Sequence, residues 1–263
     1  MNILQKITQR ARQRVTEQKR VVSYEEMVCR AQACVAGNFE FPFEQALRAD
    51  DIAFICEVKR ASPSKGIIAA DFPYLDIARE YERGGAAAIS VLTEPDYFAG
   101  SDVYLREIAE VVGIPLLRKD FTVDPYMIYE AKVLGASAVL LICAVLDGDT
   151  IAEYIEIAHR LGLSALVEAH TEAEVETALA AGARIVGVNN RNLATFEVDI
   201  TLSQRLRALV PPNVLFVSES GLSTPRDIAQ LREFVVDAVL IGESIMRADD
   251  KAAAIAYLRG SAT

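Results

Sequence analysis

The stretch Gly135-Ala136-Ser137-Ala138-Val139-Leu140-Leu141-Ile142 contains the repeating unit that decides the fold. A glycine ends a helical pattern, and a run of apolar and β-branched residues follows it. Similar junctions occur at Gly84-Gly85-Ala86 and at Gly182-Ala183, and Val236-Asp237-Ala238 takes the same place without a glycine. Glycine at such a junction supplies the left-handed residue that commonly ends a helix.

Eight apolar runs recur along the chain with a mean period of about 26 residues, which is long enough for one strand and one crossover helix. They are Phe54–Val58, Ala87–Leu92, Pro115–Leu117, Ala138–Ile142, Ala165–Val167, Ile185–Val188, Val214–Val217 and Ala238–Ile241. The runs lack polar alternation, which is typical of parallel strands buried on both faces. We therefore predict an α/β fold, a (β/α)8 TIM barrel, with a doubly wound sheet as the alternative. The G-x-G-x-x-G turn that often opens a doubly wound sheet does not occur in the sequence.

The composition excludes several classes of protein. Of 263 residues, 27 are Lys or Arg and 37 are Asp or Glu, so the formal charge is −10 and we expect no nucleic-acid partner. No apolar run approaches the about 18 residues that a membrane helix needs, so we expect no membrane partner. The four cysteines and two histidines show no metal-ligand spacing. They indicate reduced thiols in a cytoplasmic protein, and we expect no metal.

A long segment precedes the first predicted strand. We divide the chain into an N-terminal helical extension over residues 1–50, which caps the barrel, and the barrel itself over residues 51–263. Residues 1–20 carry six basic side chains and one acidic one, and we interpret them as a solvated helix, with an Arg-rich transit peptide as the alternative. Ser23-Tyr24-Glu25-Glu26 has the pattern of a capping box and predicts that a helix starts there. A partner-binding arm is the alternative role for the extension.

Charged residues follow the predicted strands at their C-terminal ends, where barrel enzymes carry their active sites. The first strand ends in Glu57 and Lys59, and a spacing of two places both side chains on one face. Lys119 and Glu168 end two later strands. Charges that face one cavity must pair, and such clusters shift pKa values into the range that proton transfer needs. We therefore expect these four residues to serve catalysis.

Several neighbouring residues are interpreted as structural. Arg60, Arg118 and Asp120 are offset by one from the inward face, so we expect them to form ion pairs at the rim. His170 is interpreted as a hydrogen-bonded structural residue. Tyr97-Phe98 is expected to pack locally rather than to form an aromatic wall of the site.

Three turns rich in serine and glycine are predicted at the same end of the barrel: Ser62-Pro63-Ser64-Lys65-Gly66, Ser220-Gly221 and Gly242-Glu243-Ser244. Free backbone N–H groups at helix N-termini bind phosphate, and barrel enzymes often place a phosphate after their last two strands. Each turn alone also fits ordinary turn chemistry. Three of them at one face favour a small phosphorylated substrate.

Seven segments, in order along the chain, resemble the signature segments of the indole-3-glycerol phosphate synthase family. They are Phe54–Ser64, Leu92–Glu94 with Phe98–Ser101, Leu117–Phe121, Leu166–Glu168, Gly187–Leu193, Ser218–Gly221 and Ile241–Ser244. The resemblance implies a substrate, 1-(2-carboxyphenylamino)-1-deoxyribulose 5-phosphate. It also implies that this substrate is decarboxylated, cyclised and dehydrated to indole-3-glycerol phosphate in tryptophan biosynthesis, without a cofactor or a metal.

The resemblance also implies roles for individual residues. Lys119 would be the general acid that protonates the leaving oxygen, and Glu168 the general base. Lys59 would hold the anthranilate carboxylate and share the acid duty. The residues implied to orient these groups, the substrate hydroxyls and the aromatic ring are Glu57, Asn189, Glu219 and Phe121.

By the same resemblance, the phosphate and ribulose bind at the predicted turns. The implied residues are Ser62, Arg191, Ser220, Gly221, Gly242 and Glu243. Some relatives carry a small hydroxyl residue in place of Glu243, and a carboxylate repels phosphate, so we expect the Glu243 side chain to point away. The chain ends soon after the eighth unit. We therefore expect the monofunctional form, as a monomer or homodimer.

Three other functions on the same barrel are the alternatives. A Schiff-base lyase would use Lys59 or Lys119 as its nucleophile. A phosphate-sensing barrel would bind its ligand without turnover and would not need Lys119 and Glu168 together. The long extension and the Glu57 and Lys59 pair argue against a phosphoribosylanthranilate isomerase.

Overall fold

The structure is a computed structural model that describes residues 1–35, 37, 40–192 and 196–260. Eight parallel strands close into a barrel in the order β1-β10-β9-β8-β7-β6-β5-β4. Their bounds are β1 (Ala53–Val58), β4 (Ala88–Leu92), β5 (Leu116–Lys119), β6 (Ala138–Ile142), β7 (Ser164–Ala169), β8 (Ile185–Asn189), β9 (Leu215–Glu219) and β10 (Ala238–Ile241). Each predicted run overlaps one strand, so the predicted barrel is confirmed. Leu193, the last residue of one signature segment, lies outside the described residues.

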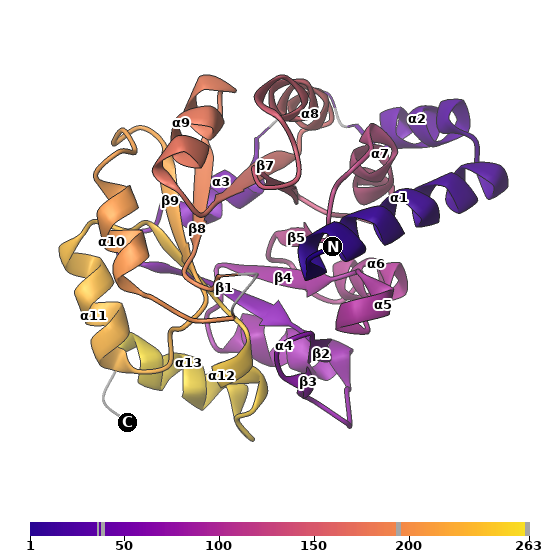
Figure 1. Cartoon of the computed structure of the whole chain (residues 1–263). Coiled ribbons are helices and arrows are strands. Elements are labelled where there is room, and N and C mark those ends of the chain that lie inside the picture. The colour runs from indigo at the N-terminus through magenta and orange to yellow at the C-terminus, as the bar shows by residue number, and fades with distance from the viewer. Residues whose placement is uncertain (36, 38–39, 193–195, 261–263) are drawn as a thin grey trace.

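Helices surround the strands on the outside of the barrel (Figure 1). The helices that connect the strands are α4 (Tyr74–Arg83), α6 (Asp102–Ala109), α7 (Pro125–Val133), α8 (Gly148–Arg160), α9 (Glu172–Ala180), α10 (Thr201–Arg207) and α11 (Pro225–Glu233), and α13 (Lys251–Arg259) follows the last strand. Short extra elements follow three strands: the hairpin β2 (Ala61–Ser62) and β3 (Gly66–Ile67), α5 (Pro95–Phe98) and α12 (Glu243–Met246). No helix within the described ranges is long and apolar enough to cross a membrane.

Alternate residues of each strand enter two different cores. Ile55 of β1 packs inside the barrel, whereas Phe54, Cys56 and Val58 pack against the surrounding helices. All six residues of β1 are buried. Burial on both faces explains why the apolar runs show no polar alternation.

The helix-to-strand junctions use left-handed residues, as the sequence predicts. Gly85, Gly135 and Gly182 have φ angles of +81°, +88° and +87°. At the junction that lacks a glycine, Val235 takes the left-handed conformation with φ +54°. A side chain in this region costs about 1 kcal/mol, so the tertiary packing of α11 and β10 must outweigh that strain.

The first helix, α1 (Ile3–Val21), is not the solvated helix that we expected from its charge. It buries Ile7, Ala11 and Val15 on one face, a spacing of four that keeps them in line. In Figure 1 its N-terminal end lies over the barrel and its C-terminal end reaches α2 at the periphery. Its basic side chains form ion pairs with residues after β4 and β5: Arg10 with Asp96, Arg14 with Glu94 and Asp120, and Lys19 with Asp124.

Two further helices follow in the described part of residues 1–50, one on the outside of the barrel and one at its opposite end. Ser23 begins α2 (Tyr24–Ala33) by accepting a hydrogen bond from the Glu26 amide, and α2 lies beside α7 (Figure 1). The short α3 (Pro42–Leu47) then places Glu44 against Ser164 and Arg184, near the starts of β7 and β8.

The expectation of rim ion pairs for Arg118 and Asp120 was wrong. The Arg118 side chain is 2% exposed and its Nη2 lies 2.7 Å from both Asp102 and Glu130. Asp120 is also buried, and it accepts hydrogen bonds from Arg14 and Thr93. Arg118 lies on the outward face of β5, where helices rather than solvent cover the strand, and Asp120 directly follows the strand and faces Arg14 and Thr93. Arg60, unlike Arg118 and Asp120, is exposed.

Replacing Arg118 tests the weight of this buried pairing. Arg118→Leu leaves Glu130 buried without its cation, so we expect the free energy of unfolding to fall by about 3 kcal/mol. The control Arg160→Leu breaks an exposed pair with Glu156 and should cost less than about 0.5 kcal/mol. Urea denaturation measures both, and equal effects would contradict the interpretation.

Candidate active site

A cavity of about 440 Å³ lies at the C-terminal ends of the barrel strands. All thirteen residues that the sequence assigns to the site line it: Glu57, Lys59, Ser62, Lys119, Phe121, Glu168, Asn189, Arg191, Glu219, Ser220, Gly221, Gly242 and Glu243. Strand alternation explains the convergence. Lys119 continues the inward row of Leu117, and Glu168 continues that of Leu166, so both side chains emerge where the apolar core ends.

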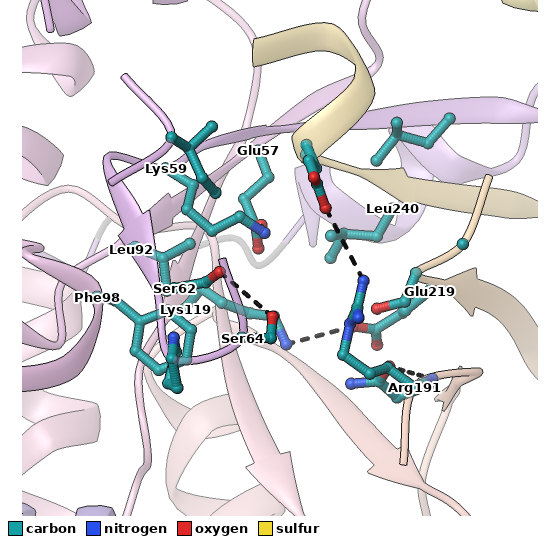
Figure 2. Close-up of a pocket in the computed structure, with 18 of the residues that line it drawn as sticks. Glu57, Lys59, Ser62, Ser64, Leu92, Phe98, Lys119, Arg191, Glu219 and Leu240 are labelled. Carbon is teal, nitrogen blue, oxygen red and sulfur yellow. Dashed lines mark hydrogen bonds and ion pairs between the residues drawn. The ribbon is translucent and has the colours of Figure 1, made fainter. Parts of the chain in front are cut away.

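The Lys119 ammonium is held between two carboxylates. Its Nζ lies 2.9 Å from Oε2 of Glu168 and 3.2 Å from Oε2 of Glu219, and the side chain is 13% exposed. Figure 2 shows Lys119 and Glu219 reaching toward each other beside Glu57 and Lys59. Burial lowers the pKa of Lys119, but the carboxylates outweigh burial and raise it above its ordinary value.

The two carboxylates beside Lys119 respond in opposite directions. Burial opposes ionisation of Glu168, yet Lys119, His170 and a hydrogen bond from Asn189 lower its pKa below the ordinary value. Burial raises the pKa of Glu219 to about 7, and the charge of Glu168 adds to the rise although Lys119 opposes it. Oε1 of Glu219 is buried and accepts no hydrogen bond from the described residues. The two carboxyl groups thus differ, since the pKa of Glu168 lies below its ordinary value and that of Glu219 is raised to about 7.

Glu57 and Lys59 pair directly with each other at the end of β1. Gly242, at the end of β10, leaves the space they occupy, because a Cβ there would lie 2.6 Å from Glu57 Oε2 and 2.9 Å from Lys59 Nζ. The glycine therefore makes room for this ion pair. That function is separate from the backbone role implied for Gly242 by the resemblance.

Gly187 of β8 has a comparable function, which the sequence reasoning missed. A Cβ on Gly187 would collide with Oε1 of Glu219 and would meet Leu166 at 3.0 Å. Only glycine leaves enough space at this position for the Glu219 carboxylate to approach the backbone of β8. The signal was present, because a glycine inside an apolar strand often marks a close approach.

One side of the cavity is apolar. Phe121 and Phe98 lie with their ring centroids 6.1 Å apart, and both line the cavity. The interpretation of Phe98 as local packing therefore missed its position on the cavity wall. Sequence reasoning also missed the other apolar residues that line the cavity: Ile3, Leu4 and Ile7 of α1, with Ile68, Leu92, Leu140, Ile142, Phe196, Leu222, Leu240 and Ile241.

The opposite side carries the turns after β8, β9 and β10. Ser220 has φ +69° and Gly221 has φ +82°, so a non-glycine residue is held in the left-handed region at the cavity wall. Asn190 stabilises this conformation, since its amide donates to the Ser220 carbonyl and to Ser218 Oγ at 3.1 Å each. The Asn190 carboxamide, which follows β8, thus links the ends of β8 and β9 and fixes the turn after β9.

The Glu243 side chain lies among three cations at this side. Its carboxylate is 3.3 Å from Arg247, 3.5 Å from Lys65 and 4.0 Å from Arg191. It is 30% exposed and lines the cavity. The described residues therefore present a partly neutralised cationic cluster at the mouth. They contain no group of three or more His, Cys, Asp or Glu side chains arranged to hold a metal ion.

A closed (β/α)8 barrel with a buried acid–base cluster and a cationic rim defines an enzyme of proton-transfer chemistry on an anionic small molecule. Residues 4–258 match the family model described as indole-3-glycerol phosphate synthase. The chain belongs to the indole-3-glycerol phosphate synthase family.

Relatives of known name cover nearly the whole chain. The indole-3-glycerol phosphate synthase of Ruminiclostridium cellulolyticum is 58% identical over 99% of this chain and 100% of its own length. That of Endomicrobium trichonymphae is 54% identical over 98% and 99%. Among solved structures, 3-hexulose-6-phosphate synthase has a TM-score of 0.63 at 16% identity and covers 81% of this chain and 100% of its own, which shows the shared fold.

The family defines the reaction. The enzyme is a carbon–carbon lyase of tryptophan biosynthesis that decarboxylates, cyclises and dehydrates 1-(2-carboxyphenylamino)-1-deoxyribulose 5-phosphate to indole-3-glycerol phosphate. Membership decides against the Schiff-base lyase, the phosphate-sensing barrel and the isomerase.

Adding one methyl group at Gly187 tests whether catalysis needs the space beside this residue. We expect Gly187→Ala to push Glu219 off Lys119 and to lower kcat between about 10- and 100-fold. The control Gly148→Ala adds a Cβ that meets Thr177 at 3.4 Å, and neither residue lines the cavity, so kcat should be unchanged. Circular dichroism confirms folding of both variants. A fully active Gly187→Ala would show that Glu219 tolerates displacement.

Proposed function

We propose that the residues around Lys119 carry out the chemistry and that the phosphate binds among the turns and cations on the opposite side of the cavity. The observation that supports this arrangement is the Lys119 ammonium, 2.9 Å from Glu168 in a mostly buried setting. It puts a proton donor and a proton acceptor side by side at the centre of the cavity. Substrate atoms placed above the pair reach both groups.

Lys119 acts as the general acid and Glu168 as the general base. The raised pKa of Lys119 keeps its proton in place until a more basic alkoxide or hydroxide develops on the substrate. The lowered pKa of Glu168 keeps it ionised and ready to accept a proton. Since the two groups touch, a proton that Glu168 removes can return to Lys119 for the next donation.

The proton count of the reaction suits two lysines and one base. The first proton joins the ketone oxygen as the carboxylate-bearing ring carbon forms a bond to the ketone carbon. The C–CO2 bond then breaks, and its electron pair restores the aromatic ring as carbon dioxide leaves. The second proton joins the hydroxyl that leaves as water, and the base removes one proton as the indole forms. Lys119 donates to the leaving oxygen, and Lys59 holds the anthranilate carboxylate and shares the donation.

The remaining polar residues at the cavity floor orient these groups. Glu57 pairs with Lys59, and Asn189 donates to Glu168. Glu219, with a pKa near 7 and an unused oxygen, suits a substrate hydroxyl as its partner. The ring of Phe121, beside Phe98, packs on the aromatic ring of the substrate.

Replacing Lys119 tests the general-acid role. We expect Lys119→Met to lower kcat between about 100- and 10,000-fold, because a positioned general acid contributes a factor of that size. The chain has no tryptophan, so product formation is followed by new indole fluorescence. The control Lys132→Met on α7 removes a lysine that does not line the cavity and should retain activity. Near-normal turnover by Lys119→Met would contradict the role.

The phosphate and ribulose bind at Ser62, Arg191 and the turns that contain Ser220, Gly221, Gly242 and Glu243. Arg191 supplies the charge, with Lys65 and Arg247 nearby through their shared contact with Glu243. Backbone N–H groups of the turns supply further donors. The Glu243 carboxylate swings away from Arg191 when the phosphate arrives, because the two anions compete for the same cations.

Replacing Arg191 tests the phosphate end. We expect Arg191→Gln to raise KM between about 10- and 100-fold, because a charge-assisted hydrogen bond to phosphate is lost, while kcat changes little. Steady-state kinetics by indole fluorescence separates the two constants. Arg205→Gln, an exposed change on α10, is the control for the loss of one positive charge. An unchanged KM for Arg191→Gln would place the phosphate elsewhere.

Residues 1–50 form a helical unit that completes a barrel domain of residues 51–263. Ile3, Leu4 and Ile7 of α1 line the cavity, so the extension supplies part of the apolar wall. The protein acts in the cytoplasm as a monomer or homodimer. Its partner is the small phosphorylated substrate, without nucleic acid, membrane or cofactor.

A further inference from the structure

His170 lies directly behind Glu168, just past the end of β7. Its Nε2 is buried, makes no hydrogen bond among the described residues and lies 3.8 Å from Oε1 of Glu168. Its Nδ1 lies 3.7 Å from Oε2 of Glu174 on α9, and the backbone N–H of His170 donates to the same oxygen at 2.6 Å. The imidazole, 16% exposed, therefore stands between two carboxylates.

In this position the charged form of the imidazole interacts more favourably with its surroundings than the neutral form. The neutral ring has one N–H and one lone pair, so it satisfies one carboxylate and repels the other. The imidazolium has an N–H on each side and attracts both carboxylates, at 3.8 Å and 3.7 Å. Burial lowers the pKa of His170, but Glu174 and Glu168 outweigh burial and raise it above its ordinary value.

The described residues that face His170 are acidic or neutral. Glu168 faces it from β7, Glu174 from α9, and Glu219 of β9 lies further away. Cys143, after β6, donates its thiol to the Glu174 carbonyl, and burial raises its pKa to about 12, so it stays neutral. The positive charge of Lys119 is separated from His170 by the Glu168 carboxylate.

We propose that His170 is a positioning residue for the base, holding Oε1 of Glu168 while Lys119 holds Oε2. With one cation at each oxygen, the carboxylate cannot rotate without losing a contact, so its orientation toward the substrate is fixed. Glu174 in turn fixes the imidazole. This inference rests on the proposed role of Glu168 as the general base.

The coupling between His170 and Glu168 is measurable without turnover. The chain has only two histidines, so proton NMR resolves two imidazole titrations, and His159→Gln assigns them. Burial beside Arg184 lowers the pKa of His159 to about 4, opposite to the shift of His170. We expect Glu168→Gln to lower the pKa of His170 by about one unit and to leave His159 unchanged. No change at His170 would overturn the proposal.

Activity tests the positioning role itself. We expect His170→Leu to lower kcat between about 10- and 100-fold with little change in KM. His170→Gln keeps a hydrogen-bond donor near Glu168 but no charge, so its kcat should fall less than that of His170→Leu. In that variant the pKa of Glu168 rises, and the acidic limb of the kcat–pH profile should move to higher pH. The control His159→Gln should retain the wild-type profile.

Each failure has its own signature. Wild-type kcat and pH profile in both His170 variants, with Glu168→Gln inactive, would overturn the positioning role alone. A fully active Glu168→Gln would overturn the base role, whatever the NMR shows. If His170→Leu does not fold, the His170→Gln pH profile decides, and an unshifted acidic limb overturns the proposal.

Discussion

The structure of the site depends on one buried ammonium group. Lys119 is nearly enclosed by protein, and a lone charge in that setting would lose its proton or unfold the site. Glu168 from β7 and Glu219 from β9 prevent this, and the charge of Lys119 in turn favours the ionised form of both carboxyl groups. The three groups come from three strands, so the cluster exists only when the barrel is closed. Fold and acid–base chemistry are therefore coupled through charge pairing.

The same alternation builds the core and the site. Along β5, Leu117 faces the barrel interior and Lys119, two residues later, faces the cavity. The pattern changes from apolar to charged where the barrel opens. Gly187 and Gly242 add the second requirement, because inward carboxylates need empty space beside them. Inward-facing charged side chains on one strand thus require a glycine on, or just after, the neighbouring strand.

Much of this was predictable from local sequence. Strands, junction glycines and inward-facing charges depend on residues two to four positions apart, and such patterns are visible in the chain. The docking of α1 could not be predicted in this way, because it depends on contacts such as that of Arg14 with Asp120, which lie 106 positions apart in the sequence. Arg118 was misjudged for the same reason: its outward face is buried by helices whose placement no local pattern gives. The place of Phe98 on the cavity wall likewise required the packing of distant elements.

The distribution of charge explains how an acidic chain binds a substrate with two anionic groups. The basic side chains of α1 form ion pairs with carboxylates near the mouth of the cavity. Arg10, Arg14 and Lys19 each pair with an aspartate. Without these pairs the acidic loops after β4 and β5 would repel the substrate. Lys59 and Arg191 then face the cavity from different strand ends, one beside Glu57 and one beside the turns. Net charge describes the surface of this protein, whereas the potential inside the cavity is set by which cations the fold leaves facing it.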